Sequence, residues 1–389
     1  MEKIRLGVIG TGSHGTGHIR NIRNGMTPEI EVAAVCDIDP DALARIRDTF
    51  GDIPAFENAS DLINSDLVDA ILIVTPHYDH PPIAIEAMKK GLHVMCEKPA
   101  GVYTKQVKEM NAVAGESNVV FGMMFNQRTN PLYIKTRELV QSGEFGEIRR
   151  VNWIITNWYR PQAYYNSGAW RATWSGEGGG VLLNQAPHNL DLWQWICGMP
   201  SKVYTKMHFG KWHDIEVEDD VTTMVEYPNG ATGTFITTTG DWPGSNRLEI
   251  TMDKAKIVVE DGKLHLWELE MTEQEFTATS TIPFSQPKFT CREVQPEGVE
   301  TGHCGILNAW AGAILRGEPL IAPGEEGING LTISNAMHLS AWTGKEVELP
   351  FDDEEYYALL MERVKTSRRK ENVKTVISDL SATYNTGSK

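Results

Sequence analysis

Residues 7–19 read GVIGTGSHGTGHI, and this stretch decides the fold. It follows an apolar run that is typical of a buried strand, and its glycines have the spacing G-x-G-x-x-G at the start of a predicted helix. The first glycine permits a tight turn, the second lets the backbone approach a pyrophosphate, and the third lets the helix pack on the strand. Free N–H groups at the helix start attract the anion. The predicted phosphate loop consists of Gly10, Gly12, Ser13, His14 and Gly15.

An acidic residue ends the second predicted strand. Asp37 lies in VAAVCDIDP, 22 residues after Gly15, where a carboxylate accepts hydrogen bonds from both ribose hydroxyls and repels a 2′-phosphate. The pattern therefore predicts NAD rather than NADP as cofactor, with Ile38 beside the ribose. The alternative is that Asp37 only caps the next helix, but Asp39 is the better cap because Pro40 follows it.

The first third of the chain alternates apolar strands with helix-like segments. The predicted strands are IRLGVI, EVAAVC, DAILIV, LHVMC and VVFGM. The predicted helices cover residues 15–24, 40–50, 78–90 and 104–115. Such alternation implies right-handed crossovers and a parallel sheet. We therefore expect an NAD-binding α/β Rossmann domain over residues 1–125.

The rest of the chain has a different texture. Long alternating segments, separated by turn signals at Pro228-Asn229-Gly230 and Asp261-Gly262, indicate antiparallel strands. Helices are expected at residues 181–197, 307–315 and 354–367. Residues 126–389 should thus form an α+β substrate-binding and oligomerisation domain with an open, mainly antiparallel sheet. Helices would cover one face, and a second subunit the other, giving a homodimer or homotetramer.

Composition narrows the classes of partner and compartment. The formal charge of −16 argues against nucleic acid, and no apolar run of about 18 residues would cross a membrane. The basic run at residues 365–370 suits a solvated helix face. Five scattered cysteines without metal-type pairing predict reduced thiols and no metal site. No secretory signal is visible, so we expect a cytoplasmic protein.

A lysine follows the fifth predicted strand. LHVMCEKPAG places Glu97, Lys98 and Pro99 at the strand end, and parallel sheets bind ligands beyond the carboxyl ends of their strands. Lys98 is therefore expected to point toward the crevice, with Pro99 stiffening the turn. The alternative is an ordinary surface lysine.

A second polar group lies in GGGVLLNQAPHNLDLW, residues 178–193. Spacings of four and three put Asn184, His188 and Asp191 on one helical face if the helix continues through Pro187. Pro187 favours the start of a new helix, which leaves that register open. A core histidine hydrogen-bonded to Asp191 is the structural alternative for His188.

These motifs, together with VTPHYDH at residues 74–80 and the tail at residues 317–350, resemble the Gfo/Idh/MocA family of nicotinamide-dependent oxidoreductases. The resemblance spans about nine-tenths of the chain. It implies a two-domain enzyme, usually a dimer or tetramer, that acts on sugars, polyols and their derivatives. It also implies that Lys98 touches cofactor and substrate, often through a cis bond to Pro99, and that His188 is the family's histidine. The further cofactor contacts implied are Thr75, Pro76, His77, His80, Glu97, Lys98, Asn126 and Arg171.

The two basic side chains suit alcohol oxidation. Removal of hydrogen from an alcohol carbon requires loss of the hydroxyl proton, which a neutral imidazole such as His188 can accept. Lys98 would stabilise the developing alkoxide. The family usually has an aspartate where this chain has Asn184, and an amide can orient a hydroxyl but cannot accept a proton. Whether Lys98 or His188 is the base stays open.

Aromatic residues are dense between residues 153 and 174. Flat amphipathic rings suit the apolar faces of a sugar, although a strand tryptophan such as Trp153 is better placed in the core. We expect Tyr165 and Trp170 to bind substrate with Lys98, Asn184 and His188. The seven aromatic residues are Trp153, Trp158, Tyr159, Tyr164, Tyr165, Trp170 and Trp174.

The leading hypothesis is an NAD-dependent dehydrogenase acting on a secondary hydroxyl of a sugar or glycoside, such as the 3-hydroxyl. One alternative is a redox-neutral hydrolase or lyase that keeps NAD bound. Another is a non-catalytic NAD-binding regulator, which is less favoured because Lys98 and His188 are both present.

Overall fold

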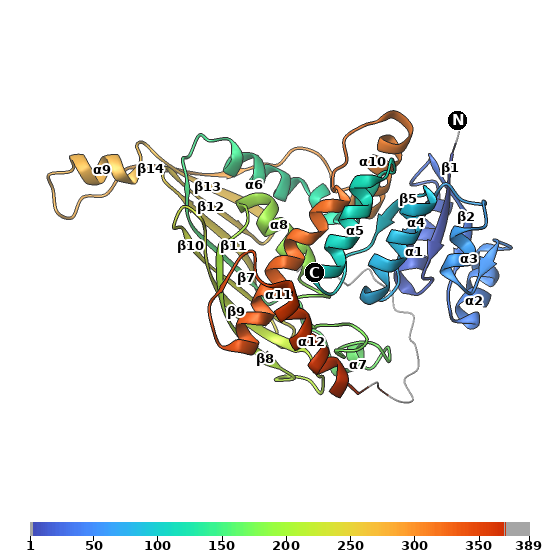
Figure 1. Ribbon diagram of the computed structural model, residues 1–389. Coiled ribbons are helices and arrows are strands. Elements are labelled where there is room, and N and C mark those ends of the chain that lie inside the picture. Colours follow the sequence, from blue (N-terminus) through green and yellow to red (C-terminus); the bar gives the residue numbers. More distant parts are fainter. Residues whose placement is uncertain (1–2, 369, 371–389) are drawn as a thin grey trace.

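The structure is a computed structural model that describes residues 3–368 and 370. Two sheets lie side by side (Figure 1), and the first is a six-stranded sheet with the order β3-β2-β1-β4-β5-β6. Its paired strands are all parallel, and this order is that of the Rossmann fold. The strands are β1 (Ile4–Ile9), β2 (Ile30–Cys36), β3 (Ala55–Phe56), β4 (Ala70–Ile73), β5 (His93–Cys96) and β6 (Phe121–Met123).

The helices of this sheet confirm the predicted alternation. The Asp39 side chain accepts a hydrogen bond from the Asp41 N–H and so caps the second helix, as its position before Pro40 predicts. A short helix at Ala59–Ile63 lacks a clear sequence pattern and was not predicted. The helices are α1 (Ser13–Arg23), α2 (Pro40–Phe50), α3 (Ala59–Ile63), η1 (His77–Asp79), α4 (His80–Lys90) and α5 (Thr104–Glu116).

The second sheet has nine strands in the order β14-β13-β12-β11-β7-β10-β9-β8-β15. All its pairs are antiparallel except that of β7 with β10, so the prediction of a mainly antiparallel sheet is confirmed. The turn signals at 228–230 and 261–262 join β9 to β10 and β12 to β13. The strands are β7 (Ile148–Ile155), β8 (Lys202–Phe209), β9 (Glu218–Glu226), β10 (Thr232–Thr238), β11 (Asn246–Met252), β12 (Ala255–Glu260), β13 (Lys263–Leu269), β14 (Phe289–Val294) and β15 (Val347–Glu348).

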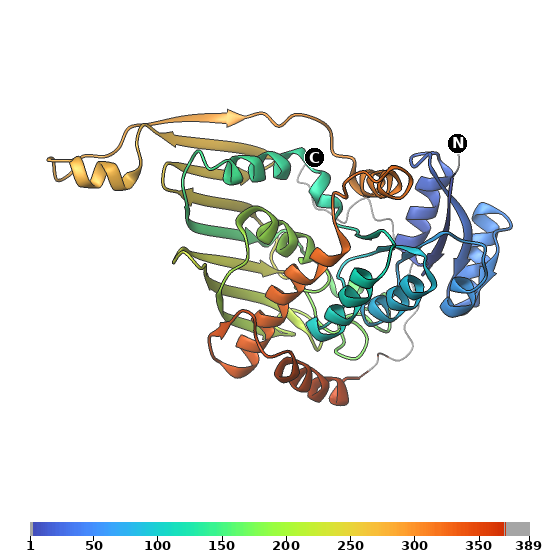
Figure 2. The same cartoon turned by 45° about the horizontal axis from the view of Figure 1, so that its top comes forward.

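Helices cover one face of this large sheet (Figure 2), where α11 packs on β8 and α6 on β12 and β13. The opposite face carries exposed side chains such as Tyr204 and Met224. Two of the covering helices, α6 and α11, were not predicted, and α11 is buried over most of its circumference and so lacks an amphipathic period. The helices of this half are η2 (Asn126–Thr129), α6 (Pro131–Gln141), α7 (Gln162–Tyr165), α8 (Pro187–Cys197), α9 (Glu273–Thr279), α10 (Gly302–Arg316), η3 (Gly324–Glu326), α11 (Gly327–Thr343) and α12 (Asp353–Thr366).

Two predicted boundaries need correction. The helix expected at 181–197 begins only at Pro187, because residues 181–186 form turns. The basic run at 365–370 is not a helix face, because α12 ends at Thr366. Beyond that end, Ser367 and Lys370 contact the second half of the molecule, and Arg369 lies outside the described residues.

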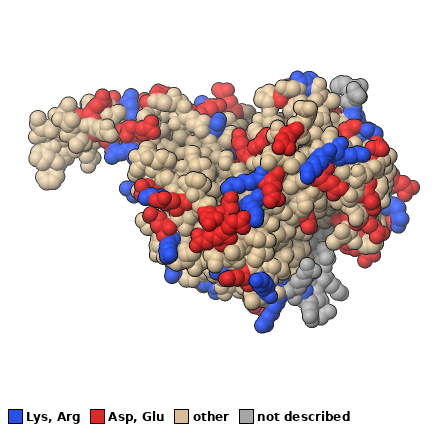
Figure 3. Space-filling model, viewed as in Figure 1, with Lys and Arg blue, Asp and Glu red and all other residues tan. Residues whose placement is uncertain are grey.

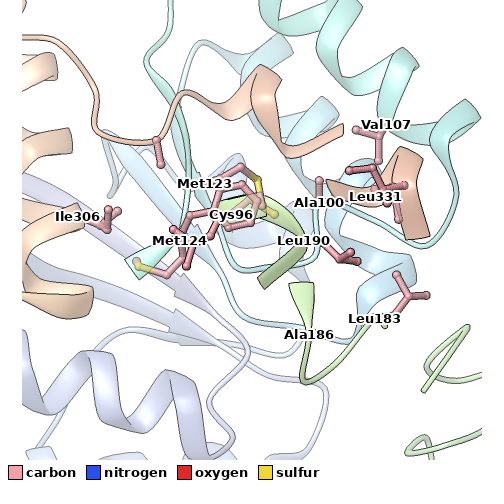
Figure 4. Close-up of a cluster of buried hydrophobic side chains, with 14 of the residues drawn as sticks. Cys96, Ala100, Val107, Met123, Met124, Leu183, Ala186, Leu190, Ile306 and Leu331 are labelled. Carbon is pink, nitrogen blue, oxygen red and sulfur yellow. The ribbon is translucent and has the colours of Figure 1, made fainter. Parts of the chain in front are cut away.

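A buried apolar cluster joins the two halves (Figure 4). It combines Cys96 and Ala100, on either side of Lys98, with Ala186 and Leu190, on either side of His188. Ile306 of α10 and Leu331 of α11 pack into the same cluster. Close packing of this kind holds backbone segments in one arrangement. The cluster therefore fixes the two chain segments that carry the predicted catalytic groups.

Charged side chains of both signs lie on the surface (Figure 3). On the face seen in Figure 3, acidic and basic side chains are interspersed, without a continuous basic stripe among the described residues. Among the residues that the structure describes, no helix is long and apolar enough to span a membrane.

Candidate functional site

The phosphate loop has the geometry that a dinucleotide needs. Gly10 has φ +96°, and a Cβ atom there would lie 2.5 Å from the Val74 carbonyl oxygen of the neighbouring strand. A Cβ on Gly15 would lie 1.9 Å from the Gly10 oxygen, whereas one on Gly12 would meet nothing within 4 Å. Gly10 and Gly15 thus close the turn, and Gly12 leaves space for a ligand. Among the described residues, no side chain caps the start of α1, where Ser13 and His14 lie. The loop fits a pyrophosphate.

The end of β2 fits the adenosine ribose. Asp37 Oδ2 accepts hydrogen bonds from the Thr11 N–H at 2.7 Å and the Thr11 hydroxyl at 2.9 Å, so the carboxylate is held beside the loop. A carboxylate has about four acceptor sites, so capacity remains for ribose hydroxyls. Ile38 is 87% exposed next to it, an apolar surface on which a base can lie. Sequence and geometry agree on an NAD-type site.

The turn after β5 carries Lys98. The Lys98–Pro99 peptide bond is cis, and the Lys98 backbone N–H donates to Glu97 Oε2 at 3.2 Å. The half-buried ammonium donates to the backbone oxygen of Asn184 at 2.8 Å. Burial lowers the pKa of Lys98, and the carboxylates of Glu97 and Glu177 oppose that shift. Lys98 thus points across to the second half of the chain and is not a surface lysine.

His188 is the second residue of α8 and is buried. Burial lowers the pKa of His188 well below its usual value, and the nearby Lys98 charge lowers it further. The imidazole is therefore neutral at physiological pH and chemically able to accept a proton. The folded chain brings together the ammonium and the imidazole that lie 90 residues apart in sequence.

Asp191, which the sequence offered as a hydrogen-bond partner for His188, is bound by an arginine. Arg128 holds Asp191 through two hydrogen bonds, from Nε at 2.8 Å and from Nη2 at 2.6 Å. Both side chains are about 1% exposed, and Arg128 also pairs with Glu326 of η3 at 2.5 Å. Asn184, in the turns before α8, does not share a helical face with His188 and Asp191. The ion pair anchors α8, whose first turn carries His188.

Asn184 belongs to a polar network that the sequence did not reveal. Its side-chain amide donates to Glu177 Oε1, and its oxygen accepts from the Tyr164 hydroxyl at 3.2 Å. Arg171 and Gln185 also donate to that hydroxyl, at 2.8 and 3.1 Å. Burial raises the pKa of Glu177. The Glu177 carboxylate thus contacts the amide that replaces the family's aspartate. In the sequence, the only sign of a role for Glu177 is its position directly before the glycine run.

The VTPHYDH segment lies between the two halves. The His77 Nδ1 atom is 3.1 Å from the Glu177 backbone oxygen, and the ring meets Trp170 edge-on at 5.9 Å. Both His80 nitrogens face backbone oxygens, of Pro99 and Thr75, at 2.8 Å, so the contacts of His80 support the Lys98 turn rather than reach a ligand. The Thr75 hydroxyl, beside Pro76, is buried without a hydrogen-bond partner among the described residues, as a group awaiting a ligand would be. Asn126 is buried at the start of η2.

The aromatic series is only partly available to a sugar. Trp153 is buried, as predicted, but so are Trp158, Trp174 and Tyr165. Tyr165 is 3% exposed, and its hydroxyl donates to Thr239 at 2.7 Å. This placement corrects the expectation that the Tyr165 ring binds substrate. Half-buried Trp170, which stacks on Arg171, and exposed Tyr159 remain accessible.

The end of the described chain reaches the same region. Ser367 donates to Glu216, and the Lys370 ammonium donates to the Tyr165 backbone oxygen at 2.7 Å. Burial lowers the pKa of Lys370, the Glu177 carboxylate opposes that shift and the Arg171 charge adds to it, so Lys370 interacts electrostatically with the polar network. Sequence reasoning missed this contact because it joins residues 205 positions apart.

Comparisons with known proteins agree with this geometry. Residues 4–125 match a family model described as "Oxidoreductase family, NAD-binding Rossmann fold", and residues 133–258 match "GFO/IDH/MocA C-terminal domain". The inositol 2-dehydrogenase of Corynebacterium glutamicum is 30% identical over 203 residues, which cover 51% of this chain and 55% of that protein. The levoglucosan dehydrogenase of Pseudarthrobacter phenanthrenivorans is 26% identical over 267 residues, 60% of this chain and 67% of that protein. The chain spans about half the length of the first curated relatives it matches.

Solved structures extend the similarity to most of the chain. The WlbA dehydrogenase of Bordetella pertussis, in complex with NADH and UDP-GlcNAcA, has a TM-score of 0.75 and 27% sequence identity. The match covers 90% of this chain and 100% of that chain. Both sheets thus have counterparts in that protein.

Proposed function

Because the chain belongs to the GFO/IDH/MocA oxidoreductase family, we propose that it is an NAD-dependent dehydrogenase of a sugar or glycoside. The reacting group in this proposal is a secondary hydroxyl, such as the 3-hydroxyl. The observation that carries the proposal is the hydrogen bond of 2.8 Å from Lys98 to Asn184, which joins the cofactor half to the segment leading to His188.

Each side chain has a role that its chemistry supports. His188, neutral because burial lowers its pKa, can accept the hydroxyl proton, and the Lys98 ammonium can stabilise the alkoxide. Asn184, held by Glu177 and Tyr164, can orient a sugar hydroxyl. NAD, when bound, supplies the acceptor for the hydrogen removed from carbon. The phosphate loop and Asp37 would hold it so that its reactive ring lies near Lys98.

A glycoside is favoured over a bare polyol by two exposed aromatic residues of the second half of the chain. Tyr159 and Trp242 are both exposed, and their ring centroids lie 5.9 Å apart. Such rings can stack on a second sugar or an aglycone. The test is a panel of glycosides, free sugars and inositols, followed by NADH absorbance. Stoichiometric NADH from one glycoside supports the proposal. Cleavage without NADH would replace it with a redox-neutral enzyme, and NAD binding without any turnover would replace it with a regulator.

Replacement of Asp37 by alanine should weaken NAD binding about 10- to 100-fold, because it removes one or two hydrogen bonds to a charged group. The same replacement should reduce discrimination against NADP. Fluorescence titration with both cofactors measures this change. Asp39→Ala is the matched control, because Asp39 caps α2 and should change stability by about 1 kcal/mol but not cofactor preference. A wild-type preference for NADP would contradict the role of Asp37.

The rate of alcohol oxidation should rise with pH to a plateau, because the base must be deprotonated. Burial lowers the pKa of both Lys98 and His188, so the rise should be complete below the usual lysine value of about 10.4. A pH profile of kcat/KM measures it, and the same profile for His188→Asn identifies the base. If that variant loses the rising limb, His188 is the base. If the variant keeps the rising limb, Lys98 is the base. A rate that falls over the whole range would contradict both.

A further inference from the structure

We propose that His18, Glu97 and His303 bind a divalent transition-metal cation of the Zn²⁺ class between α1, the end of β5 and α10. Two of these residues belong to the cofactor half, and the third comes from the C-terminal half of the chain. The cation would join α10 to the turn that carries Lys98. This site is distinct from the proton-handling group of Lys98 and His188.

The geometry brings three ligand atoms together. His18 Nε2 lies 2.8 Å from Glu97 Oε1, and the rings of His18 and His303 meet edge-on with centroids 5.3 Å apart. The three potential ligand atoms all lie within 4.8 Å of one another. Two ligands of one tetrahedral Zn²⁺ ion lie about 3.4 Å apart, as follows from bond lengths of about 2.0–2.1 Å. His303 is half-buried in the first turn of α10, and the proposal requires its side chain to move until the ligand atoms have this spacing.

The charges also suit a cation. Glu97 is 6% exposed, and within the described residues its ion pair is with His18, not with a lysine or arginine. A buried carboxylate needs a compensating partner, and a bound divalent cation would supply one. The His18 Nδ1 atom is buried and has no hydrogen-bond partner in the described part of the chain, so this ring has an unused nitrogen. One carboxylate and two imidazoles can coordinate a divalent ion, and the carboxylate offsets one of its two positive charges.

The ligand types indicate which metal. Imidazole nitrogen suits Zn²⁺, Fe²⁺, Ni²⁺ and Cu²⁺, whereas Mg²⁺ and Ca²⁺ prefer all-oxygen sites. Two histidines and a glutamate leave a fourth position open for water. No sequence pattern indicates the site, because the ligands are separated by 79 and 206 residues and form no spacing motif.

The test measures metal binding directly, without an activity assay. Tag-free protein is dialysed against EDTA, returned to chelator-free buffer and titrated with ZnCl₂ in a calorimeter, and its zinc content is then measured by mass spectrometry. We expect one Zn²⁺ per chain. His303→Gln should weaken binding at least about 100-fold, the upper end of the cost of losing even an outer-shell partner. His208→Gln, an exposed histidine on β8, is the matched control and should bind as the wild type does.

Equal zinc binding by the wild type and His303→Gln, or no binding by the wild type, would overturn the proposal. Circular dichroism verifies that each variant is folded. Co²⁺ titration of the wild type gives a second readout, because a site of this kind yields d–d absorption bands that His18→Asn should abolish. Absence of these bands in the wild type would also overturn it. Neither readout depends on the substrate.

Discussion

Alanine at Lys98 or His188 is expected to lower turnover of the sugar substrate about 10³-fold, within the range typical for loss of a general acid–base or electrostatic group. Neither change should alter the NAD dissociation constant by more than about threefold, because in the proposal the phosphate loop and Asp37 make most of the polar contacts to the cofactor. Lys98 is hydrogen-bonded to the Asn184 backbone and the Lys98 charge acts on His188, which supports the proposal that the two groups act on one hydroxyl. Single-turnover kinetics and NAD titration separate the two effects.

Lys89→Ala is the matched control, because Lys89 is an exposed lysine on α4 and should have wild-type turnover. Combining the two active-site changes should cost much less than the product of their single effects, as is usual for residues that act as a unit. Unchanged turnover in both single variants would show that the site is wrongly assigned. Loss of NAD binding in both would place the two residues in cofactor binding instead of the chemistry.

The second large effect is expected on stability. Arg128→Met should lower the free energy of unfolding by about 3–5 kcal/mol, because it leaves the buried Asp191 carboxylate without its partner. Burial raises the pKa of Asp191 and the hydrogen bonds from Arg128 oppose that shift, so the variant should bury a protonated or badly solvated acid. Urea denaturation followed by tryptophan fluorescence measures the loss. Because Asp191 anchors α8, His188 should be displaced and turnover should fall as well.

A double variant distinguishes an unpaired charge from lost packing. Arg128→Met combined with Asp191→Leu removes both charges and should recover most of the stability. Arg247→Met is the control, because the ion pairs of Arg247 with Glu249 and Glu260 are partly exposed and its loss should cost about 1 kcal/mol or less. A double variant that is less stable than Arg128→Met would contradict the explanation.

Local patterns were sufficient for much of the fold. The phosphate loop, α2 with its Asp39 cap and the hairpin turns at 228–230 and 261–262 all follow from nearby residues, and each is confirmed. By contrast, α11 was not predicted, because packing on several sides removes the polar face by which a surface helix is detected. Tyr165 was misplaced for a similar reason. An aromatic residue near a glycine-rich segment can face a ligand or the core. Here the Tyr165 ring is buried, and its hydroxyl donates a hydrogen bond to Thr239.

The sequence by itself determined the cofactor half, since turn glycines, a strand-end aspartate and alternating apolar runs act within short stretches of chain. It also singled out Lys98 and His188. Only the tertiary structure decided that Arg128 binds Asp191, that Glu177 holds Asn184, and that His303 lies beside His18 and Glu97. These contacts join residues brought together by packing of separate elements, and no local pattern encodes which distant partners will meet.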